Sequence, residues 1–321
     1  MHIDILKCHG SENDFILIDE IKHRYGFSED DRRGLTRMLS DRDQGIGSDG
    51  ILFVLPSDAA DARMRMFNSD GSEAEMCGNG LRCVARYIIE KLDQPQVKIE
   101  TEKAVLSVKK VAPIYESIET FEVSIEPVSF DVGTLPLHVS TNPALEVRIP
   151  ELTEDFTFTA VSMPNPHLVA VTEDYLESDL MEIGKKANQM KNVLPNGVNV
   201  SFVKMLDNQR VFVQTYERGV GLTNACGTAM SASSVVATQV GPHHIGQIIT
   251  VLNKGGMVQC IVEHEAGEYT VKLRGNATNV YQQTLQVDLE NRTFQVDAEA
   301  IYFPEEIQSY HELKQHAAKQ G

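Results

Sequence analysis

The chain has 321 residues, of which 42% are hydrophobic, and its formal net charge is −17. This length predicts two domains, and this apolar fraction is sufficient for packed cores. The acidic balance argues against a nucleic-acid or membrane partner, because no basic stripe is present to neutralise phosphates. The N-terminus lacks the features of a signal peptide and no apolar run approaches about 18 residues, so we expect a cytoplasmic protein.

The cysteines do not form a disulfide pattern. There are five of them in a long chain, an odd count, and none forms a CxxC motif. No histidine lies near them at the spacing of metal ligands, so we predict no metal site. We interpret Cys8, Cys83 and Cys260 as small buried apolar residues. Cys77 and Cys226 differ, because each precedes a glycine at the expected start of a helix, where a thiolate is stabilised.

The first half of the chain predicts strands, polar loops and one amphipathic helix. Residues 3–19 read as a strand, a loop with Asn13, and a second strand. Residues 63–87, RMRMFNSDGSEAEMCGNGLRCVARY, predict a strand, a polar loop and a helix that begins at Cys77 and ends near Asp93. The apolar positions of this helix follow i, i+3, i+4, i+7 spacing: Leu81, Val84, Ala85, Ile88 and Leu92.

The same pattern recurs about 150 residues later, in VFVQTYERGVGLTNACGTAMSASSVV at 211–236. The second helix, at about 225–240, has no charged residue, and we expect it to be buried on all sides. The two segments align without a gap and match Phe67 with Tyr216, Asn68 with Glu217, Cys77 with Cys226, Gly78 with Gly227 and Asn79 with Thr228.

Two earlier landmarks also recur. Asn165, in the strand–loop–strand segment 159–171, takes the place of Asn13, and Asn199 roughly matches Asp49 of GIGSDGILFV. We interpret Asp49 mainly as a turn-forming residue. Matched landmarks in one order and at similar spacing indicate an internal duplication.

The remaining segments are short and β-rich, with a boundary near residues 130–136. Many strands with at most two helices in each half predict sheets curled around a helix, which is an α+β fold. The expected strands are Val97–Thr101, Ala104–Val111, Phe121–Ile125, Val211–Tyr216, Ile248–Leu252, Val258–Glu263 and Tyr269–Leu273. The C-terminal end is polar and helical in pattern, and we assign it no chemistry.

Two opposed cysteines suit the inversion of a stereocentre without a cofactor. One, as thiolate, would remove the proton from a Cα, and the other, as thiol, would deliver a proton to the opposite face. Backbone N–H groups at the two helix starts would bind the substrate carboxylate. Arg218 would bind a second carboxylate and Glu217 an ammonium group. No lysine lies in a setting that suggests a pyridoxal Schiff base.

At this point the chain resembles the diaminopimelate epimerases, which are pyridoxal-independent enzymes of lysine and peptidoglycan precursor synthesis. The matching segments are HGSENDF, GIGSDG, FNSDGSEAEMCGNGLRCVARY, NPH, YERGVG, ACGT and RGNA. They cover the chain except for the tail after about residue 290. The resemblance implies epimerisation of LL- to meso-diaminopimelate, no cofactor or metal, and a possible homodimer.

The resemblance also implies roles for individual residues. Cys77 and Cys226 would be the acid/base pair, with His167 and Glu217 supporting the chemistry beside them. The backbone amides of Gly78, Asn79, Gly227 and Thr228 would bind the reacting carboxylate. Further contacts to substrate would come from Asn13, Asn68, Asn165, Asn199, Glu217 and Arg218.

The implied fold is a pair of pseudo-symmetric mixed β-barrel-like domains, each around a central helix, with the catalytic cleft between them. Residues 1–130 plus about 278–303 would form the domain that carries Cys77. Residues 131–277 would form the domain that carries Cys226, and residues 304–321 a polar tail.

Departures from the family pattern leave a changed substrate open. They are Glu12, Pro164, Ala229 and Met230. One alternative is therefore another pyridoxal-independent amino-acid racemase or epimerase on the same fold. A further alternative is a non-catalytic amino-acid-binding or redox-sensing protein in which Cys77 and Cys226 close a disulfide.

Overall fold

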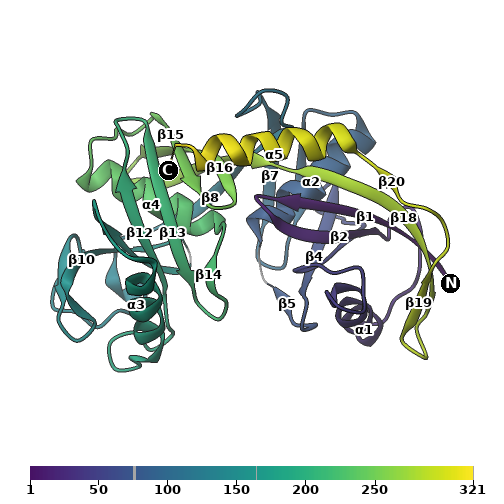
Figure 1. Cartoon of the computed structure of the whole chain (residues 1–321), viewed down its shortest axis with the longest axis horizontal. Helices are drawn as coiled ribbons and strands as arrows, with labels where there is room; N and C mark the ends of the chain where they lie inside the picture. The colour runs from purple at the N-terminus through teal and green to yellow at the C-terminus, as the bar shows by residue number, and fades with distance from the viewer. Residues whose placement is uncertain (75–76, 164, 321) are drawn as a thin grey trace. The chain divides into compact units, whose positions relative to one another are not determined.

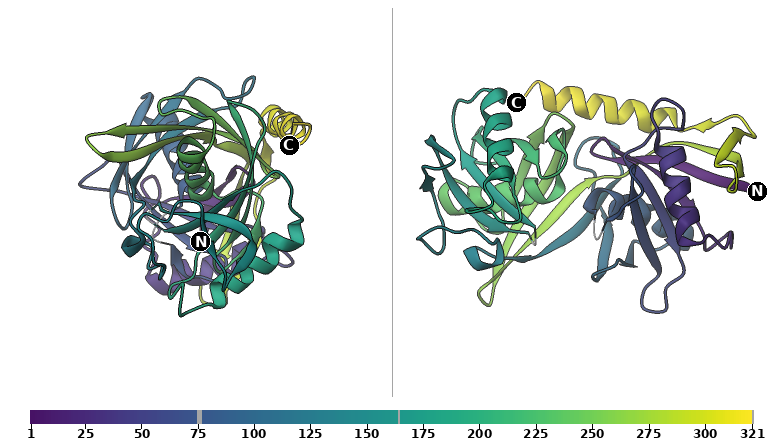
Figure 2. Two further views of the ribbon diagram at one scale, coloured as in Figure 1. Left: turned by 90° about the vertical axis from the view of Figure 1, so that its left-hand side faces the viewer. Right: turned by 90° about the horizontal axis from the view of Figure 1, so that it is seen from below.

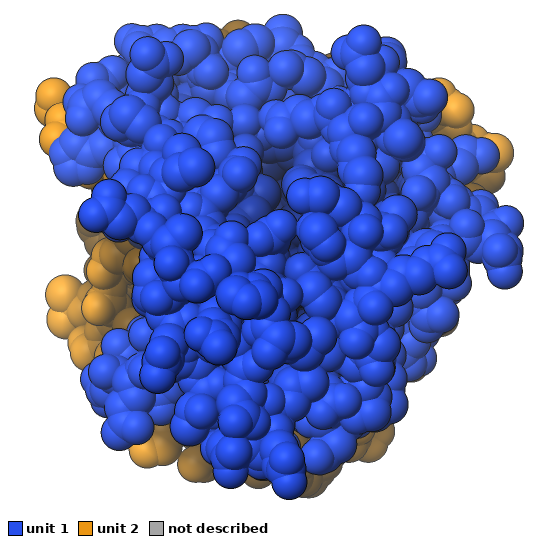
Figure 3. Space-filling view, turned by 90° about the vertical axis from the view of Figure 1, so that its right-hand side faces the viewer, with its two compact units in different colours: residues 1–123, 275–312 blue, residues 124–274, 313–321 orange. Residues whose placement is uncertain are grey.

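The computed structural model describes residues 1–74, 77–163 and 165–320. The chain divides into two compact units (Figure 1). Unit 1 comprises Met1–Val123 and Gly275–Glu312, and its surface is drawn in blue in Figure 3. Unit 2 comprises Ser124–Arg274 and Leu313–Gly321. Each unit is described by itself.

Unit 1 is built on a mixed sheet that encloses one helix. Its strands follow the order β1 (His2–Gly10), β2 (Asn13–Asp19), β3 (Gly50–Leu55), β4 (Ala62–Asn68), β6 (Gln96–Glu100), β7 (Val105–Val111) and the first part of β8 (Thr120–Val128). The other edge of β1 pairs with β18 (Thr278–Asp288), which in turn pairs with β19 (Thr293–Val296) and β20 (Ile301–Tyr302). The short β5 (Glu73–Ala74) pairs with β4. The helices are α1 (Glu29–Ser40), α2 (Gly78–Leu92) and the first part of α5 (Pro304–Ala318).

Unit 2 has a corresponding sheet. Its strands follow the order β9 (Val147–Ile149), β10 (Thr153–Ser162), β11 (Pro166–Val171), β12 (Asn199–Met205), β13 (Arg210–Glu217), β15 (Ile248–Asn253), β16 (Gly256–Glu265) and β17 (Glu268–Asn276). The short β14 (Gly221–Thr223) pairs with β13. The helices are α3 (Glu177–Gln189) and α4 (Gly227–Val240), with a 3-10 turn, η1, at Val132–Thr134.

The predicted duplication is confirmed by the strand pairings. From β1 to β8 the successive pairs are antiparallel, parallel, antiparallel, parallel, antiparallel and antiparallel. The pairs from β10 to β17 have the same succession. In each unit one helix joins the second strand to the third, and another follows the fourth. The same topology therefore occurs twice in the chain.

The two helices that follow the cysteines lie inside their units, as expected. α4 is buried from Ala229 to Ala237, and the left-hand view of Figure 2 shows it amid the green and teal strands. α2 buries most of its predicted stripe and ends at Asp93, which has a left-handed backbone with φ 52°. One stripe residue was predicted wrongly: Leu92 is 43% exposed, because it lies in the last turn of the helix.

The sheet of unit 1 is apolar on both faces. One face forms a cluster with α1 that includes Ile16, Ile51, Phe53 and Leu35. On the other face, Leu52 lies against Gly80 of α2. Strands covered on both sides read as continuous apolar runs, which explains the sequence ILFVL in β3. The buried positions of Cys8, Cys83 and Cys260 are also confirmed.

Among the described residues, none of the helices is long and apolar enough to cross a membrane.

A glycine in α3 provides a test of packing in unit 2. A Cβ added at Gly184 would lie 2.3 Å from Cγ of Tyr216, which belongs to the adjacent β13. We expect Gly184→Ala to lower the free energy of unfolding by about 1–3 kcal/mol from overpacking, partly offset by the roughly 1 kcal/mol that alanine gains in a helix. Urea unfolding followed by circular dichroism measures the change.

The matched control is Gly34→Ala in α1, where the nearest atom would be Nε of Arg292 at 3.5 Å, an ordinary contact. This variant should be unchanged or more stable by about 0.5–1 kcal/mol. A stabilised Gly184→Ala protein would contradict the close contact between α3 and Tyr216.

Candidate active site

In unit 1, Cys77 lies against the side chain of Asn13. Cys77 is the N-cap of α2, and its Sγ accepts the N–H of Gly80 at 3.4 Å. The thiol in turn donates to Oδ1 of Asn13 at 3.6 Å. The same oxygen accepts Nδ2 of Asn79 at 3.2 Å. Three predicted site residues are thus joined at one acceptor atom.

Asp49 fixes the direction of the Asn13 amide. Its Oδ2 accepts Nδ2 of Asn13 at 2.7 Å and the N–H of Asp14 at 3.0 Å. Because the amide nitrogen is held by Asp49, the oxygen must face Cys77. The sequence analysis interpreted Asp49 mainly as a turn-forming residue and missed this positioning contact. Its match with Asn199 was the signal that would have found it.

Arg82 fixes the direction of the Asn79 amide in the same way that Asp49 fixes that of Asn13. The sequence analysis did not predict this role. The side chain is fully buried, and its guanidinium donates to Oδ1 of Asn79 at 2.9 Å. The amide nitrogen of Asn79 is therefore left to face Asn13.

Asn68 and Gly78 lie at the edges of this cluster. Asn68 ends β4, as Glu217 ends β13, and its Nδ2 donates to Oγ of Ser72 at 3.0 Å. Gly78 begins α2, and a Cβ built there would meet no atom within 4 Å. Among the described residues, neither forms a side-chain hydrogen bond with Cys77. The backbone at Gly78 therefore borders open space at the helix start.

In unit 2 the predicted residues form a continuous chain of polar contacts. Sγ of Cys226, the N-cap of α4, lies 3.5 Å from Oγ1 of Thr228, which accepts Nδ2 of Asn165 at 3.1 Å. Oδ1 of Asn165 lies 3.0 Å from Nε2 of His167. Gly227, between Cys226 and Thr228, is the first residue of the helix. This group of side chains in unit 2 thus combines a thiol, a hydroxyl, an amide and an imidazole.

Asn199 lies at the end of this series of polar contacts. Its Oδ1 accepts the backbone N–H of Arg218 at 2.8 Å, and its Nδ2 lies 3.5 Å from Nε2 of His167. The Arg218 side chain is exposed and donates to the carbonyl of Asn196 at 2.8 Å. β11 and β12 are parallel and place His167 opposite Asn199, so the strand register creates this contact.

His167 is a neutral imidazole inside unit 2. It has no exposed surface, and burial lowers its pKa from 6.5 to about 3, with a smaller contribution from the charge of Arg218. Asn165 offers an oxygen to Nε2, so Nε2 carries the proton and Nδ1 is the bare nitrogen. Nδ1 has no hydrogen-bond partner among the described residues.

Glu217 lies beside the second cysteine. Burial raises the pKa of this carboxyl group, and a hydrogen bond with the Cys226 side chain opposes the rise. A carboxylate that accepts a hydrogen bond from a thiol can also take its proton, and a raised pKa makes it a better base. Glu217 is thus suited to activate Cys226.

Cys77 is a thiol, whereas the sequence analysis did not say which of the two cysteines is the thiol and which the thiolate. Burial raises its pKa to about 11, although the amides of Gly80 and Asn79 lower it. Loss of hydration therefore outweighs the helix N-terminus at this sulfur. In this structure Cys77 is the protonated partner at neutral pH.

The departures from the family pattern fall in two places. Ser11 and Glu12 form the turn between β1 and β2, with φ of 53° and 66°, which costs side-chain-bearing residues of order 1 kcal/mol each. Ala229 and Met230 are buried inside α4. Pro164 lies outside the described residues.

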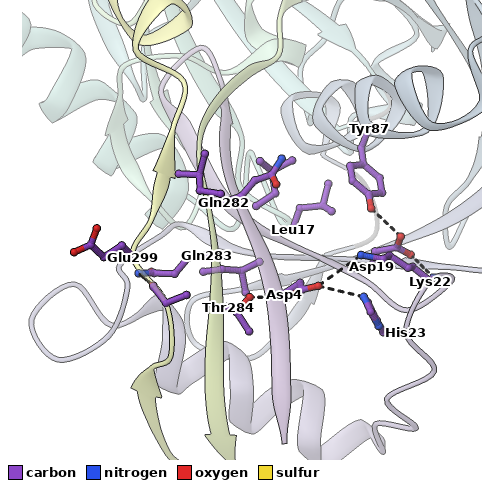
Figure 4. Close-up of a pocket in the computed structure, with 14 residues that line it drawn as sticks. Asp4, Leu17, Asp19, Lys22, His23, Tyr87, Gln282, Gln283, Thr284 and Glu299 are labelled. Carbon is purple, nitrogen blue, oxygen red and sulfur yellow. Dashed lines mark hydrogen bonds and ion pairs between the residues drawn. The ribbon is translucent and has the colours of Figure 1, made fainter.

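A pocket of about 380 Å³ in unit 1 lies elsewhere (Figure 4). Asp4, Asp19, Lys22, His23 and Tyr87 are among its lining residues, and none of the predicted site residues is. Asp19 accepts hydrogen bonds from Tyr87, Lys91 and two backbone amides, so its charge is already satisfied. We therefore do not assign this pocket to the active site. The described residues also contain no group of three or more His, Cys, Asp or Glu side chains able to hold a metal ion.

Comparisons with known proteins identify relatives over nearly the whole chain. The family model for diaminopimelate epimerase matches residues 5–116 and 159–280, so α5 lies outside the match. Diaminopimelate epimerase of Clostridium acetobutylicum is 48% identical over 99% of this chain and 96% of its own length. Diaminopimelate epimerase of Ligilactobacillus salivarius is 44% identical over 91% of this chain and 93% of its own length.

Solved structures support the fold at lower identity. A PhzF-family phenazine biosynthesis protein of Bacillus anthracis has a TM-score of 0.65 and 15% identity, covering 89% of this chain and 100% of that one. A hydroxyproline epimerase of Agrobacterium vitis, solved with trans-4-hydroxy-L-proline, has a TM-score of 0.60 and 15% identity, covering 90% and 92%. At this identity the likeness concerns the fold alone, and the predicted α+β class is confirmed.

The low pKa of His167 predicts a loss of stability in acid. The folded value of about 3 lies below the ordinary 6.5, so the unfolded chain binds more protons between these values. The stabilisation is complete above pH 6.5 and is lost as the pH falls. Between pH 6.5 and 5 we expect His167 to account for a loss of about 2 kcal/mol.

Urea unfolding of the wild type and of His167→Gln at both pH values measures this difference, because the other titrating groups are common to both proteins. The stability of the variant should fall less on acidification. An equal fall in the two proteins would contradict a neutral, buried His167.

Proposed function

The chain belongs to the diaminopimelate epimerase family, and from this premise we propose that it interconverts LL- and meso-2,6-diaminopimelate by proton transfer at the α-carbon. The observation that carries the proposal is the duplication of one arrangement, in which a cysteine is the N-cap of a helix and an asparagine side chain bonds the second residue of that helix. As an isomerase of this kind it needs two groups that exchange a proton with one carbon, and each unit supplies one thiol.

The two cysteines act as a base and an acid on opposite faces of the substrate α-carbon. A thiolate removes the α-proton, and the other sulfur, as a thiol, delivers a proton to the opposite face. In the substrate-free protein we assign the thiol to Cys77, because burial holds its pKa near 11. Glu217, hydrogen-bonded to Cys226, takes the proton of that thiol and generates the base.

The carbanion is stabilised through the substrate carboxylate. The amides of Gly78 and Asn79 and those of Gly227 and Thr228 are the first N–H groups of α2 and α4, which have no partner within the helix. Hydrogen bonds from them absorb the negative charge that develops as the α-proton leaves.

The asparagine side chains, His167 and Arg218 define the rest of the site. Neutral donors and acceptors at Asn13, Asn68, Asn165 and Asn199 orient the substrate without competing for its charges. Arg218 binds the distal carboxylate with its guanidinium fork. The proton transfers use side chains of the chain itself, so no cofactor enters this mechanism.

We also propose a cytoplasmic location and a homodimer, in keeping with the family resemblance. Sedimentation velocity of the purified full chain distinguishes the dimer from the monomer.

The first prediction concerns the cysteines. Incubation of the reduced protein with LL-diaminopimelate in D₂O should give the meso isomer with one deuterium at the inverted α-carbon. Cys77→Ala and Cys226→Ala should each lower kcat by about 10²–10⁴-fold or more, the usual contribution of one acid or base. Nuclear magnetic resonance and mass spectrometry follow the product.

Cys260→Ala is the matched control, since this cysteine is buried in β16 and has no assigned chemistry. Meso product with protium retained at the inverted carbon, or activity in either cysteine variant equal to that of Cys260→Ala, would refute the two-thiol mechanism. A panel of other amino acids, run in the same way, tests the alternative substrates.

The second prediction concerns Asp49. Removing its carboxylate frees the Asn13 amide to rotate away from Cys77, so Asp49→Ala should lower kcat/KM by roughly 10- to 100-fold in a folded protein. Asp70→Ala is the control, because Asp70 is an exposed turn residue bonded to Ser72. Steady-state kinetics of the two variants give the comparison, and equal activity would show that Asp49 serves the turn alone.

A further inference from the structure

The β1–β2 turn beside the active site has an unfavourable backbone. Gly10 pairs with Asn13 across a two-residue turn, and both turn residues, Ser11 and Glu12, have positive φ. Hairpin turns of this kind favour Asn-Gly, because glycine and asparagine tolerate positive φ. The turn leads directly into Asn13, which accepts the Cys77 thiol. Something outside the turn must therefore hold it in place.

Polar side chains bond each of the two turn amides. The N–H of Ser11 donates to Oδ1 of Asn276 at 2.8 Å, and the N–H of Glu12 donates to Nδ1 of His9 at 3.4 Å. Arg82 adds a contact from its guanidinium to Oγ of Ser11 at 3.4 Å and bonds the Asn276 carbonyl at 2.9 Å. The orientation of the His9 ring thus decides whether the second turn amide is satisfied.

The His9 ring is held by the C-terminal helix. Tyr310, in α5, packs on His9 in a T-shaped arrangement with ring centroids 4.4 Å apart, and only 6% of Tyr310 is exposed. Burial also lowers the pKa of His9 to about 4. The ring is therefore neutral at physiological pH, and Nδ1 can accept the Glu12 N–H.

A partly buried ion pair holds α5 at this place. Glu306, one turn before Tyr310, accepts the Arg86 guanidinium of α2 at 2.6 and 2.7 Å. Glu306 also accepts the N–H of Asn279 at 2.9 Å, and Arg86 donates to the carbonyl of Ala277 at 2.6 Å. The first turns of α5 thus lie next to α2 in Figure 1. All these residues belong to unit 1.

We propose that α5 positions the candidate catalytic residues of unit 1. Tyr310 holds the His9 ring, His9 holds the β1–β2 turn, and the turn presents Asn13 to Cys77. Tyr310 is a positioning residue, since it acts through His9 and touches neither the sulfur nor Asn13. The proposal rests on the proposed role of Cys77, but its geometry can be tested at the thiol without any turnover.

The test compares the alkylation rates of Cys77 and Cys226 by iodoacetamide in the full-length protein, read by peptide mass spectrometry. In Tyr310→Ala we expect Cys77 to react roughly three- to tenfold faster, because Asn13 no longer holds the thiol, with Cys226 unchanged. Epimerase kcat/KM should fall by roughly tenfold. Tyr310→Phe, which keeps the ring, should restore both values.

Two variants in the same helix serve as controls. Ile307→Ala removes a side chain that is 38% exposed, and Leu313→Ala removes a fully buried one that belongs to unit 2. Neither should change the alkylation of Cys77, although Leu313→Ala should lower the unfolding midpoint. If Tyr310→Ala fails to fold, Tyr310→Leu retains apolar bulk without the ring and is used in its place.

The proposal is overturned if the Cys77 rate in Tyr310→Ala stays within about twofold of the wild type, or if Leu313→Ala changes it as much. It is also overturned if both cysteines change alike, because that indicates general loosening. If Cys77 reacts faster in Tyr310→Ala as expected but the wild-type protein does not epimerise diaminopimelate, the proposed function is refuted and the positioning role stands.

Discussion

The structure depends on the unpaired N–H groups at the start of two buried helices. A helix that begins inside a domain must find acceptors for its first amides, and here a cysteine sulfur takes one of them in unit 1. The remaining amides have no partner within the helix and are the groups to which we propose that the substrate carboxylate binds. The requirement for burial and the requirement for binding are thus met by the same residues. This explains why Cys-Gly opens both helices and why the surrounding strands supply amide side chains.

Much of the fold was readable in the sequence because the chain repeats itself. The match of Cys77 with Cys226 and of Asn68 with Glu217 needed no gap, and both pairs occupy equivalent places in the two units. α1 and α3 were not located, because their apolar positions are sparse and much of each helix is exposed. The burial of Leu92 was predicted wrongly for a local reason. Spacing shows which face of a helix a residue lies on, but it does not show that the helix ends there.

The site was predictable in its residue types and less so in its orientations. The asparagines and cysteines were found by their repeated positions. However, the direction of the Asn13 amide depends on Asp49, which lies 36 residues away in the chain, and that of Asn79 depends on the buried side chain of Arg82 in the same helix. The protonation of Cys77 could not be assigned from the sequence, because a helix start is visible there, whereas the loss of hydration around the sulfur depends on the whole fold.

The pairing of β1 with β18 has a consequence for synthesis on the ribosome. One edge of β1 pairs with the adjacent β2, but its other edge receives a partner only when residues 278–288 have emerged, whereas the strands of unit 2 from β9 to β17 are continuous in the sequence. The nascent chain therefore carries β1 with one unpaired hydrogen-bonding edge while the strands of unit 2 are being made. Such edges recruit foreign strands. The polar residues that alternate along the outer part of β1, at His2 and Asp4, are a defence suited to that interval.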